Sequence, residues 1–463
     1  MRKFGFVLML LSLCSTSFAR NVSGSVVCGK EKLAGVVVTD GKNFTETDKK
    51  GKFSFEIEDD AYFVYIVTPA GYVADWSTGN PVFYQKADKD NYVFELQKSA
   101  SHDVYNLIAV GDPQPKEDEQ FEEFAAVPLN DLAETGKVLE GFTCGVALGD
   151  ICYDRLHLQK RWKEEIIRTG FPFYPSIGNH DHDLKYKNDE EALTAYRENF
   201  GPENYAVRLG DDILIVLDDI IYNGRSNYKE GYTEKVLDFV EGLMEYVPED
   251  ADIFVAQHSP LNGRNNKKMV INHHEMLDLL EGHKVSFLSG HNHTHDNFEY
   301  AEGVREHNVA SICGTWWATY HCTDGTPRGY KVFTKKDGHL SWYYKAIGRD
   351  RSFQFETFKP GECENNPKSV VLNVWDSDPC WRIEWFQDGE YKGLMQQVGE
   401  YSPLHKAELE AEYKKLGKSI PEYRRSRIVR HFFAATPSEG AKEVKVKVTD
   451  RFGNVFEESV LLK

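Results

Sequence analysis

Short apolar runs that end in a polar loop recur along the middle of the chain. They cover residues 107–110, 145–148, 173–177, 253–256 and 285–288. Short apolar runs bounded by glycine and polar residues are typical of buried strands. Helix-like stretches lie around and between these runs, at 115–139, 156–168, 189–200, 236–246 and 274–282. Alternation of strands and helices predicts an α/β layered fold for this part of the chain.

Both flanks show a different pattern, in which apolar and polar positions alternate as in half-exposed strands. In the N-terminal flank the alternating runs are 22–27, 34–39 and 53–57, separated by turn signals such as Asp40-Gly41. This spacing predicts a small antiparallel β-sandwich over residues 20–100. In the C-terminal flank the runs are 369–375, 381–385 and 444–448, with a helical insertion at 404–416. We therefore expect an α/β domain at 101–350, followed by a mainly-β module at 351–463.

Residues 1–19 are predicted to be a signal peptide. Arg2 and Lys3 precede an apolar stretch at 4–13, and Ser17-Phe18-Ala19 provides small residues at the two positions that determine cleavage. The stretch is too short to span a bilayer, so no transmembrane segment is expected. Cys14 opens a lipoprotein alternative, but Leu13 is a poor fit where a small residue is required. We favour cleavage after Ala19 and export to the periplasm or the medium.

Composition and charge narrow the classes of function. Charged residues make up 28% and aromatic residues 13% of the chain, which is typical of a globular protein. The formal net charge of −18 disfavours a stable nucleic-acid partner, because phosphate backbones would be repelled. No C-x-x-C pair occurs among the cysteines, so a zinc ribbon has no support.

Each of the five apolar runs is followed by side chains that bind metals. In chain order these segments are Gly111-Asp112-Pro113-Gln114, Gly149-Asp150-Ile151-Cys152-Tyr153-Asp154, Gly178-Asn179-His180-Asp181, Val255-Ala256-Gln257-His258 and Gly290-His291-Asn292-His293. Loops at the carboxyl ends of strands are where sites form in α/β folds. Carboxylate, amide and imidazole donors suit a pair of divalent metals, with an aspartate bridging them.

In this order the segments resemble the motifs of the calcineurin-like metallophosphoesterases, namely D-x-H, a GD-x-x-D-like segment, GNH-D/E, a lone His and GH-x-H. The resemblance spans residues of about 105 to 345 and implies a four-layer αββα sandwich of two mixed sheets. It implies one metal held by Asp112, Asp150 and His293, and another held by Asp150, Asn179, His258 and His291. It further implies that His180, oriented by Asp181, assists departure of the leaving oxygen. The flanking β modules resemble those of exported bacterial members of the family.

Four further residues could ligate the metals or support their ligands. Gln114 stands where the family pattern usually has His, and it either ligates weakly, bonds through water or only shapes the site. Tyr153 is either packed under its loop or, as in purple acid phosphatases, a ligand of ferric iron. Asp154 and His295 are candidates for a metal ligand or for support of one. The ligand set suits Mn, Fe and Zn alike.

Substrate contacts are less sharply indicated. Arg225 and Arg264 lie in polar loops between motif strands, where each is either a phosphate contact or a solvated surface residue. Trp316 and Trp317 form a pair that either stacks on a substrate at the rim of the site or fills the core beneath it, and we favour the rim.

The sequence thus predicts an exported dimetal phosphoesterase that cleaves a phosphoric ester by attack of metal-activated hydroxide. A small-molecule, lipid or cell-envelope phosphodiester is the favoured substrate. The alternatives are a phosphomonoesterase similar to purple acid phosphatases and a non-catalytic surface binding protein on the same fold. The sequence gives no indication of oligomeric state.

Overall fold

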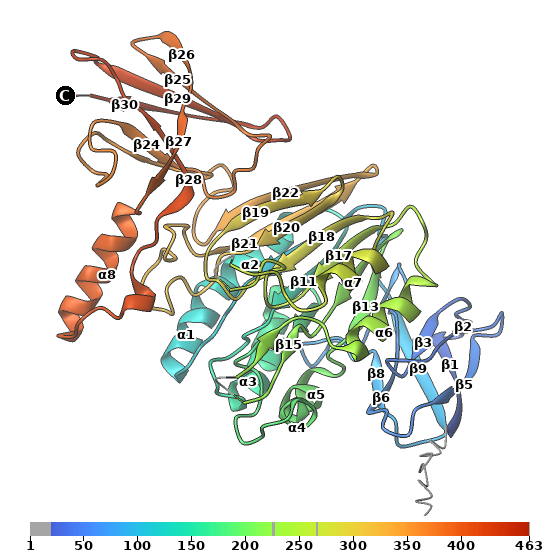
Figure 1. The fold of residues 1–463 in the computed structure, drawn as a ribbon. Helices are drawn as coiled ribbons and strands as arrows, with labels where there is room; N and C mark the ends of the chain where they lie inside the picture. Colours follow the sequence, from blue (N-terminus) through green and yellow to red (C-terminus); the bar gives the residue numbers. More distant parts are fainter. Residues whose placement is uncertain (1–19, 225–226, 265–266, 463) are drawn as a thin grey trace, which may run out of the picture.

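The computed structural model describes residues 20–224, 227–264 and 267–462 (Figure 1). The predicted signal peptide and Arg225 therefore lie outside the described residues. Along the chain a small β module comes first, a central α/β sandwich follows, and a second β module with one long helix comes last (Figure 1). None of the helices in the described ranges is both long and apolar enough to cross a membrane.

The N-terminal module consists of two small sheets. One contains β1 (Arg20–Cys28), β2 (Glu31–Lys32), β5 (Lys52–Ile57), β7 (Tyr72–Ala74) and β9 (Asn91–Lys98), and the other contains β3 (Val37–Thr39), β4 (Phe44–Glu46), β6 (Phe63–Ile66) and β8 (Tyr84–Lys86). The prediction of a purely antiparallel sandwich is wrong at one pair, because β1 and β9 are parallel. The chain passes through the second sheet between these two strands, and such a crossover permits parallel pairing.

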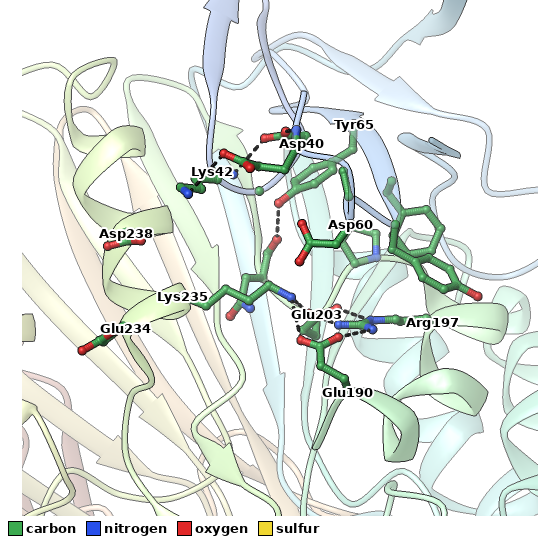
Figure 2. Close-up of a pocket in the computed structure, with 17 residues that line it drawn as sticks. Asp40, Lys42, Asp60, Tyr65, Glu190, Arg197, Glu203, Glu234, Lys235 and Asp238 are labelled. Atoms are coloured by element: carbon green, nitrogen blue, oxygen red, sulfur yellow. Dashed lines mark hydrogen bonds and ion pairs between the residues drawn. The ribbon is translucent and has the colours of Figure 1, made fainter. Parts of the chain in front are cut away.

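This module packs directly against the central sandwich. The Phe83 ring lies 4.9 Å from that of Tyr205, and the Tyr65 hydroxyl donates to the Asn204 carbonyl at 2.9 Å. A cavity of about 440 Å³ lies along the contact, and at its floor Arg197 is held by two carboxylates (Figure 2). Apolar packing and directional polar bonds together fix the module on the sandwich.

The first sheet of the central sandwich has the strand order β12-β11-β10-β21-β22. Its strands are β10 (Tyr105–Val110), β11 (Phe142–Leu148), β12 (Phe173–Ser176), β21 (Gly329–Lys336) and β22 (His339–Ala346). β10, β11 and β12 are parallel, whereas β21 and β22 form the expected antiparallel hairpin. Three motif loops therefore leave this sheet at one edge.

The second sheet has the order β13-β14-β17-β18-β20-β19. Its strands are β13 (Tyr205–Leu209), β14 (Asp212–Val216), β17 (Asp252–Ala256), β18 (Lys284–Ser289), β19 (Asp296–Ala301) and β20 (Val304–Asn308). β14, β17, β18 and β20 are parallel. The remaining two motif loops follow β17 and β18, so carboxyl ends from both sheets supply the site.

Helices cover the outer faces of the two sheets. α1 (Asp118–Ala126), α2 (Pro128–Val138), α3 (His157–Ile166) and α5 (Thr194–Phe200) share a buried cluster with the first sheet, and α6 (Glu234–Met244) and α7 (His273–Leu279) pack with the second. Between the sheets, Phe254 and Phe333 meet at 5.6 Å. The predicted αββα fold class is confirmed.

Two predicted helices are each divided in the structure. The stretch 115–139 breaks between α1 and α2, because Pro128 has no N–H to continue the first helix and instead occupies the start of the second. The stretch 189–200 divides at Leu193 into α4 (Asp189–Ala192) and α5.

The C-terminal module contains two four-stranded sheets and a long helix. The sheets are β23 (Glu356–Phe358), β24 (Val370–Asn373), β28 (Val429–Ala435) and β27 (Gln396–Glu400), and β26 (Glu390–Leu394), β25 (Arg382–Gln387), β29 (Glu443–Thr449) and β30 (Val455–Leu461). Helix α8 (Pro403–Leu416) and the 3-10 turn η3 (Glu422–Arg424) connect β27 to β28. The module is joined to the sandwich by a buried ion pair, in which Lys331 Nζ lies 2.6 Å from Asp376 Oδ1.

Candidate metal centre

Glycines in front of the motif residues allow the loops to approach each other closely. A Cβ on Gly178 would lie 2.3 Å from Asp150 Oδ1, and one on Gly290 would lie 2.5 Å from Asp112 Oδ2. Any other residue at these positions would push the carboxylates away. The glycines in the predicted strand–glycine–ligand pattern are therefore required because a larger side chain would collide with the carboxylates of the neighbouring loops.

The backbone of the site is strained in a consistent way. Left-handed φ angles between 43° and 66° occur at Asp112, Gln114, Asp150, Asp154, His291 and His293. Non-glycine residues rarely adopt this conformation, which costs on the order of 1–3 kcal/mol each. Hydrogen bonds across the site hold it in place: the Gln114 N–H donates to the Asp150 carbonyl at 3.0 Å, and the His291 N–H donates to Asp112 Oδ2 at 2.9 Å.

Four acceptor atoms converge at the first half of the centre. His258 Nε2 lies 2.9 Å from His291 Nδ1, 3.1 Å from Asn179 Oδ1 and 3.4 Å from Asp150 Oδ1. His258 donates its Nδ1 proton to the Leu148 carbonyl at 2.8 Å, which leaves the Nε2 lone pair directed into the cluster. Either a proton on His258, whose pKa is raised by Asp150 and Asp112 although burial opposes it, or a metal ion must lie between these atoms, since acceptors at such distances repel each other.

Glu230, at the end of the short strand β16 (Lys229–Glu230), fixes the second imidazole. Its Oε1 lies 3.1 Å from His291 Nε2, which therefore donates a proton to it and leaves Nδ1 free to ligate. A carboxylate behind a ligating histidine sets the tautomer and the ring orientation. No motif in the sequence marked Glu230, because it lies outside the five motif segments.

The second half of the centre contains Asp112, His293 and Gln114. His293 Nε2 lies 3.4 Å from Asp112 Oδ1, and the Gln114 amide nitrogen contacts Asp150 Oδ2. Asp112 Oδ1, Gln114 Oε1 and His293 Nδ1 are buried without a hydrogen-bond partner in the described structure. Buried polar atoms without partners are rare in folded proteins, so this half also fits a cation.

The ionisation of Asp150 agrees with this arrangement. Burial opposes its charge, but the charges of His258 and His180 and a hydrogen bond from the His180 N–H lower its pKa to about 2. Asp150 is therefore a carboxylate at neutral pH, the form that can ligate a metal.

The partner of His180 differs from the prediction. We expected Asp181 to orient this ring, but Asp181 instead accepts backbone N–H bonds from Ile151 and Gly178, both at 3.0 Å. Asp154 takes the orienting role, since its Oδ1 lies 2.8 Å from His180 Nδ1. Asp181 turns inward beneath its loop, whereas Asp154 in the neighbouring loop faces the ring.

Other predicted residues divide between the site and the core. Tyr153 stacks on the His180 ring at 4.1 Å, and Trp316 stacks on the His293 ring at 4.4 Å. The interpretation of His295 as a neighbour of the metals is wrong, because its Nε2 bonds to Asp376 Oδ1 in the C-terminal module at 2.9 Å. Trp317 is half-buried and donates its indole N–H to the Pro113 carbonyl at 3.0 Å.

The centre opens into two adjoining cavities. One cavity, of about 230 Å³, is lined by some of the candidate ligands and by neighbouring side chains, namely Gln114, Asp150, Asn179, His291, His293, Tyr153, His180, Tyr228, Arg264 and Trp316. The other, of about 320 Å³, is lined by Gln114, Lys116, Gln120, Tyr153, His180, Arg264, Trp316, Trp317, Tyr423 and Arg424. The last two belong to η3 of the C-terminal module, so this module forms part of the site wall.

Comparison with protein families identifies the chain. Three family models match in succession: the N terminal of calcineurin-like phosphoesterase over residues 20–99, calcineurin-like phosphoesterase over 105–295, and the C terminal of calcineurin-like phosphoesterase over 306–456. The chain belongs to the calcineurin-like phosphoesterases. It is a metal-dependent phosphoric ester hydrolase, and its family normally uses a dinuclear metal centre.

Three solved structures that the chain matches share little sequence with it. A dimetal phosphatase from Danio rerio is 13% identical, with a TM-score of 0.38, over 52% of this chain and 96% of that one. A 5′-nucleotidase precursor from Thermus thermophilus is 14% identical, with a TM-score of 0.32, over 53% of this chain and 54% of that one. A 5′-nucleotidase from Candida albicans is 10% identical, with a TM-score of 0.32, over 52% and 51%. No curated protein matches the phosphoesterase significantly.

Replacing the residue behind His291 tests the geometry of the centre. Glu230→Gln is expected to weaken metal binding about 10- to 100-fold, because the amide no longer fixes the proton on His291 Nε2. Metal titration of the apo-protein followed by calorimetry measures the change. Glu249→Gln makes the same substitution at an exposed glutamate outside the site. It serves as the control and should leave the metal affinity unchanged. Equal affinities for the two variants would contradict the assigned role.

Proposed function

We propose that this phosphoesterase hydrolyses phosphodiesters at a dinuclear centre. The observation that carries the proposal is the convergence of buried acceptor atoms around Asp150 at the floor of a cavity lined by cationic and aromatic side chains. A phosphoryl group placed there would meet positive charge from the floor and from one wall.

The ligand assignments remain as expected from the sequence. One ion would be held by Asp112, Asp150 and His293, and the other by Asp150, Asn179, His258 and His291. When bound, two divalent ions would neutralise phosphoryl charge and supply a water of lowered pKa. Mn, Fe and Zn suit these donors. Gln114 lies against the shared carboxylate, and we assign it to positioning Asp150 or, with its amide reversed, to weak ligation.

We assign His180 to protonation of the leaving oxygen. Burial opposes a charged ring, but Asp150 and Asp154 outweigh this effect and raise its pKa. The bond from Nδ1 to Asp154 leaves Nε2 as the group that can reach a substrate. Tyr153 supports the opposite face of the ring by stacking. We therefore interpret Tyr153 as a packing residue rather than a ligand of ferric iron.

The wider cavity favours a diester over a monoester. Lys116, Arg264 and Arg424 provide three positive side chains, and Trp316 and Tyr423 provide flat apolar surface. The Arg424 guanidinium lies 5.7 Å from the centre of the Trp316 ring, and Tyr423 meets that ring edge-on at 5.4 Å. A monoester has no second group to occupy this space, whereas the second substituent of a diester does. A planar or anionic substituent, as in nucleotides and lipid head groups, fits best.

We also propose the domain limits expected from the sequence: a signal peptide at 1–19, a β-sandwich at 20–100, the catalytic domain at 101–350 and the β module at 351–463. The family matches, which begin at residue 20 and change near residue 100, support the first two limits. The third limit is supported by β22, which ends at Ala346 and still belongs to the first sheet of the sandwich. Arg20 is therefore the expected first residue of the exported protein, and N-terminal sequencing of that protein tests the cleavage site. Retention of Met1 would contradict export by this route.

Activity on model substrates tests the proposed reaction. Mature protein loaded with Mn is expected to hydrolyse bis-p-nitrophenyl phosphate faster than p-nitrophenyl phosphate. Asn179→Ala and His258→Ala should each lower kcat/KM by about 100-fold or more, since losing a ligand costs at least as much as losing its support. His274→Ala, at an exposed position outside the site, is the control. Faster monoester hydrolysis would favour a phosphomonoesterase, and unchanged turnover in Asn179→Ala would refute the site.

A second experiment tests the wall contributed by η3. Arg424→Ala and Tyr423→Ala are expected to raise KM for the diester several-fold, because contact with the second substituent is lost, while kcat with p-nitrophenyl phosphate changes little. Arg430→Ala removes an exposed charge from the same module and serves as the control. If KM rises equally for both substrates, the wall does not select diesters.

A further inference from the structure

A second group of metal-binding side chains lies outside the dinuclear centre. His182 follows the motif loop after β12, Asp218 follows β14, and Asp189 opens α4. One ligand atom from each lies within 4.8 Å of the others.

A hydrogen bond and ring stacking fix the orientation of the His182 side chain. Its side chain is fully buried, and its Nδ1 lies 3.0 Å from the Gly178 carbonyl. A carbonyl oxygen only accepts, so Nδ1 carries a proton, and in the neutral ring Nε2 is the atom that can ligate a metal. The ring is also fixed by stacking on Tyr222, at 4.6 Å and with an angle of 9° between the planes.

The lone pair of His182 faces carboxylates rather than a donor. Nε2 lies 3.7 Å from Asp189 Oδ1, which is beyond hydrogen-bonding distance, and it has no hydrogen-bond partner in the described structure. Asp218 is buried, and burial together with the charge of Asp189 raises its pKa well above the usual range. Asp189 Oδ1 and Asp218 Oδ1 each accept one backbone N–H, from Tyr222 and Ile220, both at 3.0 Å. Potential acceptors from three segments thus lie close together in a buried place.

The basic side chains of this region do not supply that charge. Arg197 and Lys235 are bound by Glu190 and Glu203 at distances between 2.6 and 3.1 Å (Figure 2). Within the described residues, no lysine or arginine forms an ion pair with Asp189 or Asp218. A proton on a carboxylate or on His182, or else a bound cation, must therefore balance the group.

We propose that His182, Asp189 and Asp218 form a third metal site, which binds Zn²⁺ or a divalent ion of similar preference. One imidazole and two carboxylates are donors that such ions accept, with water completing the coordination. The ion would join three segments: the loop that carries Asn179 and His180, the start of α4 and the carboxyl end of β14. Its role is structural, because it ties a loop of the catalytic centre to the scaffold.

Zinc stoichiometry tests the proposal. In mature protein carrying Asp150→Asn and His258→Ala, which disable the dinuclear centre, one equivalent of Zn²⁺ per chain is expected after dialysis, measured by elemental analysis. Adding His182→Gln should remove this equivalent, whereas adding His274→Gln should leave it. Circular dichroism establishes that each variant is folded. Retention of zinc by the His182→Gln variant would overturn the site, and so would absence of zinc from the parent variant, which would leave a shared proton as the balancing charge.

A second variant tests the third site without the Asp150→Asn and His258→Ala substitutions, which could prevent folding. In the otherwise unchanged chain, Asp218→Asn should lower bound Zn²⁺ from three equivalents to two while the dinuclear centre remains loaded. If the dinuclear centre does not bind metal, the unsubstituted chain should bind one equivalent of Zn²⁺, at the third site, and Asp218→Asn should remove it. Failure of the proposed dinuclear centre can therefore be distinguished from failure of the third site. A stoichiometry that Asp218→Asn does not lower would overturn the third site.

Discussion

Mutual repulsion between buried acceptor atoms is the constraint on which this phosphoesterase depends. His258 and His291 direct lone pairs at each other across 2.9 Å, with Asp150 and Asn179 beside them. Nothing in an apolar core would favour this arrangement, and it is costly unless a positive charge lies between the atoms. The parallel strands of two sheets, the glycines that let loops touch and the left-handed backbone at the ligands all serve to hold these atoms together against that repulsion.

The three parts of the chain contribute in different ways. The central sandwich supplies every proposed ligand, because only the carboxyl ends of its parallel strands meet at one place. The C-terminal module supplies Tyr423 and Arg424 to the wall of the cavity, and the buried contact of Lys331 with Asp376 fixes that module in place. The N-terminal module shares a continuous apolar core with the sandwich and stays away from the metal cavity. The C-terminal module thus adds two side chains to the wall of a cavity that the central sandwich otherwise builds.

The loop after β12 is used on both of its sides. Asn179 and His180 face the dinuclear centre, while His182 turns toward Asp189 and Asp218. Asp181 between them binds the backbone of the neighbouring loop, so alternate residues face different partners. A short segment held by such contacts has little freedom to move, and the proposed third ion would restrict it further. Preorganisation of this kind is what electrostatic catalysis requires.

The sequence by itself determined the fold class, the five strand ends and the candidate ligands, because apolar runs, glycines and metal-binding residues are local features whose meaning survives without coordinates. The tertiary structure decided which side chains support them. It assigned Asp154 rather than Asp181 to His180, placed Glu230 behind His291 across 61 positions of sequence, and moved His295 to Asp376. It also paired β1 with β9 in parallel. Such partners depend on how loops and modules pack, and packing joins residues whose separation along the chain carries no signal.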